Sequence, residues 1–123
     1  MHALVVDDSR TTRLILKALL RQLGYEVSEA GSAGEAFDHL LRSPETALVL
    51  VDWNMPEVDG VALVSALRAD GRFADLPVLM VSGEEDAGHT AAAVRAGANG
   101  FVSKPFTKDA IRAQLEVLGI GQA

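Results

Sequence analysis

Short apolar segments alternate along the chain with longer segments whose apolar residues recur at helical spacing. The first, third and fourth apolar segments are almost uninterrupted runs of Val, Leu, Ala and Met. Continuous apolarity of this kind predicts strands that are covered on both faces, as in a parallel sheet. The predicted strands are 3–6, a weaker one at 25–28, 47–51, 77–81 and 100–103.

The segments between these strands predict helices. In the first of them, four leucines repeat at the i, i+3, i+4 and i+7 spacing of an amphipathic helix: Leu16, Leu19, Leu20 and Leu23.

Capping residues mark the helix boundaries. Ser9 and Thr107 are suitable N-cap residues for the first and last helices, and Ser32 followed by Glu35 predicts a capping box. Gly24 suits the left-handed position that follows the first helix. The predicted helices are 10–23, 32–42, 61–69, 86–96 and 107–118.

A strand–helix unit that occurs five times predicts an α/β fold. Right-handed crossovers would place helices on both faces of a five-stranded parallel sheet. A length of 123 residues is typical of one domain, and neither an internal repeat nor a linker divides the chain, so we expect a single domain at 1–123. The periodicity leaves open which of the two common doubly wound strand orders is used.

Polar side chains follow four of the five predicted strands. Asp7 and Asp8 follow the first strand, Asp52 the third, Ser82 the fourth and Lys104 the fifth. Because parallel strands end at one edge of the sheet, where ligands bind, we expect these side chains to lie together. Three neighbouring carboxylates repel one another unless a cation joins them. Oxygen ligands without His or Cys favour Mg²⁺, for which Mn²⁺ can substitute.

Asp52 can act as a nucleophile in this setting. An aspartate has a reference pKa of about 4, so it is ionised at neutral pH without a general base. Phosphoryl transfer requires positioning and neutralisation of the phosphoryl oxygens, which Mg²⁺, Lys104 and the Ser82 hydroxyl can supply. The chain has no glycine-rich nucleotide loop, so we do not expect it to use ATP itself.

Composition narrows the classes of partner and location. The chain has 17 acidic and 11 basic residues, a net charge of −6 and an isoelectric point near 4.9, which disfavours direct binding to nucleic acid or to an anionic membrane. It has no cysteine, which excludes disulfides and thiolate chemistry. No apolar run reaches the roughly 18 residues of a membrane span, and Asp7 and Asp8 interrupt the apolar start. We expect a cytoplasmic location, with neither membrane insertion nor a secretory signal.

Five short motifs, taken in order, resemble the receiver domain of bacterial response regulators, the phospho-acceptor proteins of two-component systems. The stretch 52–56 is especially similar to receivers of the CheY-like chemotaxis type. The resemblance covers the whole chain and implies a flavodoxin-like sheet with the strand order 2-1-3-4-5. The motifs are Val5-Val6-Asp7-Asp8, Val51-Asp52-Trp53-Asn54-Met55-Pro56, Asp59-Gly60, Ser82-Gly83 and Lys104-Pro105-Phe106.

The resemblance implies a metal site around the acceptor. Asp52 would be the phospho-acceptor. Mg²⁺ would be held directly by Asp8 and Asp52, mainly through water by Asp7, and by the main-chain carbonyl of Asn54.

The resemblance also implies residues that bind the phosphoryl group and respond to it. Lys104 and Ser82 would contact the phosphoryl oxygens, and Asn54 and Glu84 would tune the lifetime of the phosphoryl group. Phe101, expected to be a core aromatic, would turn inward as Ser82 moves towards the phosphoryl group. The surface formed by the fourth helix, the fifth strand and the fifth helix would thereby change.

These inferences predict a phospho-acceptor signalling switch rather than a metabolic enzyme. The donor would be a histidine kinase or a phosphotransfer protein, and the output would be a protein target that binds the altered surface. Two alternatives remain open: a receiver-fold docking module that works without phosphorylation, and a phosphatase with an aspartyl-phosphate intermediate. The intact acidic set argues against the docking module. The phosphatase would lack a general acid, because residue 54 is Asn rather than Asp.

Overall fold

The fold is built on a single sheet of five parallel strands in the order β2-β1-β3-β4-β5. The structure is a computed structural model, and it describes residues 1–52, 60–82, 95–103 and 106–119. The strand order confirms the one implied by the resemblance to receiver domains. The strands are β1 (His2–Val6), β2 (Glu26–Ala30), β3 (Thr46–Asp52), β4 (Val78–Ser82) and β5 (Gly100–Ser103).

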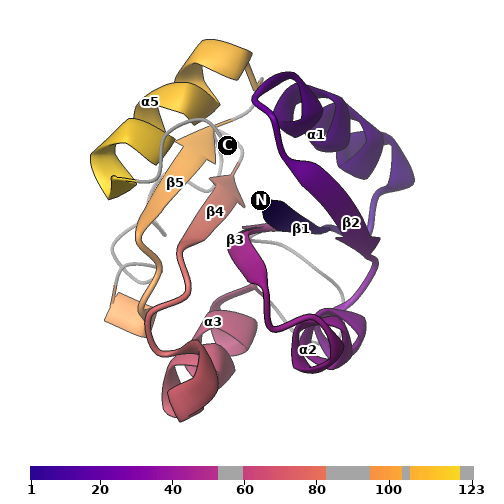
Figure 1. The fold of residues 1–123 in the computed structure, drawn as a ribbon. Helices are drawn as coiled ribbons and strands as arrows, with labels where there is room; N and C mark the ends of the chain where they lie inside the picture. The colour runs from indigo at the N-terminus through magenta and orange to yellow at the C-terminus, as the bar shows by residue number, and fades with distance from the viewer. Residues whose placement is uncertain (53–59, 83–94, 104–105, 120–123) are drawn as a thin grey trace.

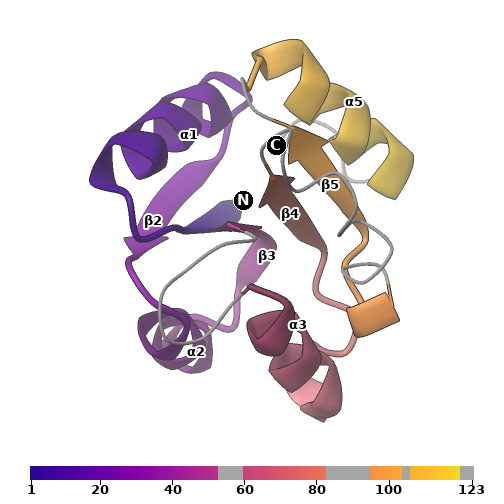
Figure 2. The same cartoon turned by 180° about the vertical axis from the view of Figure 1, so that it is seen from behind.

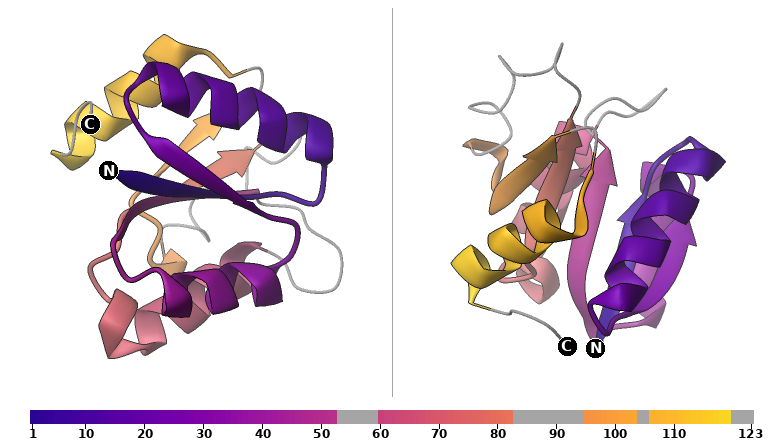
Figure 3. Two further views of the ribbon diagram at one scale, coloured as in Figure 1. Left: turned by 45° about the vertical axis from the view of Figure 1, so that its right-hand side comes forward. Right: turned by 90° about the horizontal axis from the view of Figure 1, so that it is seen from above.

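Helices cover both faces of the sheet. In Figures 1 and 2, α1 and α5 lie on one face, and α2 and α3 lie on the other. Figure 3 shows the strands as the middle layer between them. Of the predicted helix 86–96, only residues 95 and 96 are described, and both are helical. The bounds are α1 (Arg10–Gln22), α2 (Ala33–Arg42), α3 (Gly60–Ala69), a 3-10 turn η1 (Gly71–Phe73) and α5 (Lys108–Leu118).

Alternate residues of the central strands contribute side chains to two separate hydrophobic cores. On β1, Leu4 and Val6 pack towards α2 and α3, whereas Ala3 and Val5 pack towards α1 and α5. All four side chains are at most 1% exposed. This double burial explains the continuous apolarity of the strand sequences, because a strand with helices on both sides has no solvent face. Two buried cores hold the carboxyl ends of β1 and β3 firmly in place.

Three of the predicted helix caps are confirmed. The hydroxyls of Ser9, Ser32 and Thr107 each accept a hydrogen bond from the main-chain N–H three residues ahead. Gly24 has a φ of 96°, as predicted for the residue that follows the first helix. The carboxylate of Glu35 accepts from the N–H of Gly31 (2.8 Å), one residue before the N-cap, so the expected capping box is displaced by one position.

Arg68, near the end of α3, connects the chain segments that lie just before β4 and β5, at the amino ends of these strands. Its guanidinium donates to the carbonyls of Gly97 (2.9 Å) and Phe73 (2.8 Å) and to the side-chain oxygen of Asn99 (2.8 Å). The same Asn99 oxygen accepts from the N–H of Val78 (2.9 Å) at the start of β4. These bonds fix the chain just before β5.

No described helix combines the length and apolarity needed to cross a membrane.

Gly97 should be intolerant of any side chain. Its φ is +117°, and a Cβ at this position would lie 2.5 Å from Cγ of Arg68. We predict that Gly97→Ala lowers the free energy of unfolding by about 1–3 kcal/mol, the usual cost of a strained backbone conformation. Urea denaturation measures this change.

Gly34 provides the matched control for this substitution. It lies in the first turn of α2, and a Cβ there would meet nothing within 4 Å. Gly34→Ala should therefore be neutral or stabilise by up to about 1 kcal/mol. Equal effects of the two substitutions would contradict the argument from backbone conformation.

Candidate metal and phosphoryl site

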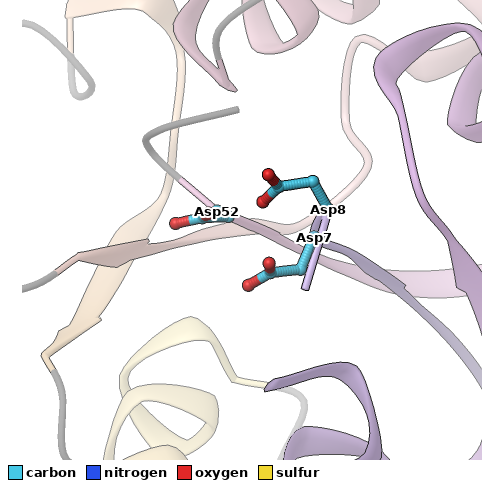
Figure 4. A group of neighbouring side chains, drawn as sticks. All are labelled: Asp7, Asp8 and Asp52. Atoms are coloured by element: carbon cyan, nitrogen blue, oxygen red, sulfur yellow. The ribbon is translucent and has the colours of Figure 1, made fainter. Parts of the chain in front are cut away.

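Three aspartates converge at the carboxyl ends of the two central strands. Asp52 is the last residue of β3, and Asp7 and Asp8 follow β1 directly. The register pairs Val6 with Val51, which brings the two strand ends side by side. Figure 4 shows the three carboxylates turned to the same side. One carboxylate oxygen from each lies within 4.8 Å of the others.

The three carboxylates differ in their exposure to solvent. Asp7 is 2% exposed and Asp52 is 5% exposed, whereas Asp8 is exposed. Two unit charges 4.8 Å apart repel by about 3.5 kcal/mol at an effective dielectric constant of about 20. Burial adds to this cost because it removes water from two of the charges. A cation bound at the cluster would therefore greatly lower its electrostatic free energy.

The donor set fits a hard divalent cation. The three side chains that meet here each offer a carboxylate oxygen, a ligand type that suits Mg²⁺, Ca²⁺ and Mn²⁺ better than it suits Zn²⁺ or Cu²⁺. A set of few protein ligands with one of them exposed leaves coordination positions for water, as Mg²⁺ requires. Three of the residues predicted from the sequence to hold Mg²⁺, Asp7, Asp8 and Asp52, are thus suited to it in type and in proximity.

Hydrogen bonds hold the loop that carries Asp7 and Asp8. The N–H of Asp7 donates to the carbonyl of Ala30 on β2 (3.1 Å). One carboxylate oxygen of Asp7 accepts from the N–H of Ser9 (2.8 Å), which forms a tight turn into α1. The carbonyl of Asp7 accepts from Nη1 of Arg13 (2.7 Å). Both main-chain polar groups of Asp7 are therefore fixed.

A charged network next to this loop was missed by the sequence analysis. Glu29, near the end of β2, accepts from Nε of Arg13 (3.1 Å) and from Nζ of Lys17 (3.2 Å). Partial burial acts to raise the pKa of Glu29, but the two cations outweigh it and hold the pKa below its ordinary value. The sequence offered one signal for this network. Arg13 and Lys17 are four residues apart on one face of the predicted helix, and the acidic Glu29 comes just past the predicted strand 25–28.

The other predicted site residues are described only in part. Asn54, Glu84 and Lys104 lie outside the described residues, and so does the side chain of Ser82. The backbone of Ser82 ends β4, at the same edge of the sheet as Asp52. The predictions for these residues therefore stay predictions.

The expectation that Phe101 is a core aromatic was wrong. Its side chain is 40% exposed, whereas its neighbour Val102 is 2% exposed. The reason is that β5 is an edge strand whose successive side chains point to opposite faces, so Val102 turns into the α1 and α5 core and Phe101 points to the other face.

Comparisons with known proteins agree with this architecture. Residues 3–116 match the sequence model of the response regulator receiver domain. The chain belongs to the response regulator receiver family. This receiver is 43% identical over 119 residues to chemotaxis protein CheY1 of Helicobacter pylori strain J99, with 96% of each chain covered. It is 40% identical over 116 residues to chemotaxis protein CheY of Pseudomonas aeruginosa, with 94% of each chain covered.

Solved structures of receivers share the fold. The receiver domain of NtrX from Brucella abortus superposes with a TM-score of 0.86 at 30% identity, over 95% of this chain and 98% of that one. Chemotaxis protein CheY4 of Vibrio cholerae superposes with a TM-score of 0.86 at 28% identity, over 95% and 97%. This receiver is therefore a CheY-like signalling protein of the two-component class.

Removal of the exposed charge should stabilise the metal-free receiver. Asp8→Asn relieves two repulsions of about 3.5 kcal/mol each before solvent screening, which exceeds the roughly 0.3–1 kcal/mol that a carboxylate contributes near a helix N-terminus. We predict a higher melting temperature without metal and weaker Mg²⁺ binding, measured by calorimetry. Asp38→Asn, an exposed aspartate on α2, is the control. An Asp8→Asn variant that melts below the wild type would count against the repulsion argument.

The Glu29 network should make stability depend on pH. A depressed pKa in the folded state contributes stability above the pKa of the unfolded chain, and that stability is lost as pH falls through the folded pKa. At pH 7, Glu29→Gln should reduce the free energy of unfolding by about 0.5–1 kcal/mol, and the difference should disappear in acid. Urea denaturation across a pH series measures it. Glu45→Gln, at an exposed position, is the matched control.

Proposed function

We propose that this receiver is a phospho-acceptor switch in which Asp52 takes a phosphoryl group from the phosphohistidine of a partner kinase or phosphotransfer protein. The observation that supports this most strongly is the placement of Asp52: it is 5% exposed at the end of β3, with oxygens of Asp7 and Asp8 within 4.8 Å of its own. Three neighbouring carboxylates do not stabilise the fold, because they repel one another. The same arrangement is useful in a site that binds a cation next to a nucleophile.

In the proposed reaction, a carboxylate oxygen of Asp52 attacks phosphorus in line with the nitrogen–phosphorus bond of the donor. A mixed anhydride forms, and the histidine nitrogen leaves with the bonding electron pair. Asp7, Asp8 and Asp52 would hold Mg²⁺, or Mn²⁺ in its place, together with the main-chain carbonyl of Asn54. The bound ion would supply neutralisation of charge on the transferred oxygens.

The remaining predicted residues act on the phosphoryl group or respond to it. Lys104 and the Ser82 hydroxyl would contact phosphoryl oxygens, and Asn54 and Glu84 would set the rate at which water removes the group. A catalytic role limited to the chain's own phosphorylation and hydrolysis makes this a signalling protein rather than a metabolic enzyme. We place the exchange in the cytoplasm, where kinases have ATP, and treat 1–123 as one receiver domain.

The proposed output is a protein contact on the face formed by residues 86–96, β5 and α5. The 40% exposure of Phe101 on β5 supports this, because an exposed aromatic side chain is available for contact with a protein partner. Val117 on α5 is also exposed, at 77%. The acidic net charge disfavours nucleic acid and anionic membranes as direct partners.

A small phosphodonor tests the proposal without knowledge of the kinase. We predict that acetyl phosphate with Mg²⁺ adds one phosphoryl group to the wild type, measured by intact mass. Chelation of the metal should abolish the gain, because the transferred charge is then unneutralised. Asp52→Asn should gain nothing, whereas Asp38→Asn, at an exposed position on α2, should react like the wild type.

Two results would contradict the proposal and point to the alternatives. A wild-type mass that stays unchanged under these conditions would favour a phosphorylation-independent docking module. Rapid turnover of many phosphomonoesters, with no role as a substrate of phosphohistidine donors, would favour a phosphatase.

A further inference from the structure

We infer that Arg13 is a positioning residue for the acidic cluster: its guanidinium fixes the peptide bond between Asp7 and Asp8 and thereby aims the carboxylate of Asp8 at the cation. The inference rests on the proposed function, because it assigns a role within the same site. Arg13 was not among the residues that the sequence analysis singled out.

The contact that carries the inference is made to the main chain. Nη1 of Arg13 lies 2.7 Å from the carbonyl oxygen of Asp7, which belongs to the peptide unit that leads into Asp8. A trans peptide is planar, so a fixed carbonyl also fixes the N–H of Asp8 in the opposite direction. The rotation of this unit sets the direction in which the Asp8 side chain leaves the backbone.

Two further hydrogen bonds of Asp7 hold the loop on either side of this carbonyl. The N–H of Asp7 is held by the carbonyl of Ala30, and its carboxylate accepts from the N–H of Ser9. These bonds anchor the two sides of the loop, at β2 and at the start of α1. Between them, the carbonyl of Asp7 is the point at which Arg13 contacts the loop, from one turn inside α1.

Arg13 is itself held in place from the far side. Its Nε donates to Glu29 (3.1 Å), and the second oxygen of that carboxylate accepts from Lys17 (3.2 Å). The side chains of Arg13 and Glu29 are 18% and 26% exposed, so both are largely shielded from water. A planar guanidinium can serve a carboxylate and a carbonyl at once with fixed geometry, which a lysine ammonium cannot do.

Orientation and charge predict opposite effects on metal binding. If Arg13 acted only through its positive charge, it would repel Mg²⁺, and its removal would tighten binding. If Arg13 orients Asp8, its removal loosens binding despite the loss of a repelling charge. The sign of the change therefore separates the two roles.

The experiment compares Mg²⁺ dissociation constants by titration calorimetry on folded variants of the whole chain. Arg13→Gln and Arg13→Lys should each weaken binding by about tenfold, the lower end of the range for partners that orient metal ligands. Arg13→Lys keeps the positive charge but loses the planar guanidinium. Weaker Mg²⁺ binding by this variant would therefore separate the effect of orientation from the effect of charge. Arg21→Gln removes an exposed charge from the last turn of the same helix, away from Glu29, and should bind Mg²⁺ like the wild type.

Gly97→Ala controls for loss of stability alone, because it lies at the opposite edge of the sheet. It should unfold more easily and bind Mg²⁺ normally. Wild-type affinity in Arg13→Lys, or tighter binding by Arg13→Gln, would overturn the positioning role while phosphorylation of the wild type still upheld the proposed function. A wild type that neither binds Mg²⁺ nor accepts a phosphoryl group would overturn both.

Discussion

Mutual repulsion among three carboxylates is the constraint around which this receiver is organised. Asp7 and Asp52 are held at the ends of adjacent central strands, each inside a sheet with apolar cores on both faces. The strands cannot separate to relieve the repulsion without opening those cores. The fold thus keeps three like charges close together, an arrangement that favours a cation, and a cation bound there would lie next to the proposed nucleophile.

Much of the sheet could be predicted because its central strands are buried on both sides and are therefore apolar throughout. The second strand was the exception. It was expected at 25–28 but spans Glu26–Ala30, because β2 is an edge strand with a mixed burial pattern in which the polar Glu29 comes before the buried Ala30. Strand order was also beyond derivation, since apolar periodicity does not encode which strands are neighbours. It came from resemblance alone.

The acidic cluster followed from chain direction, because residues after parallel strands meet at one edge of the sheet. Arg13 could not be found in the same way. Its partner is a main-chain carbonyl, which every residue has, so the contact leaves no residue type to recognise. The prediction for Phe101 failed for another reason: an apolar side chain indicates burial, but Phe101 lies on the outermost strand of the sheet and is 40% exposed there.

The uneven exposure of the cluster has a kinetic consequence. Asp8 is open to solvent while its two companions are enclosed, so an ion can reach the described carboxylates past Asp8 without any separation of strands or helices. Exchange of an ion bound there would then be limited by the loss of its hydration shell rather than by an opening of the protein. Occupancy would follow the free ion concentration almost at once, and the timing of signalling would be left to the phosphoryl group.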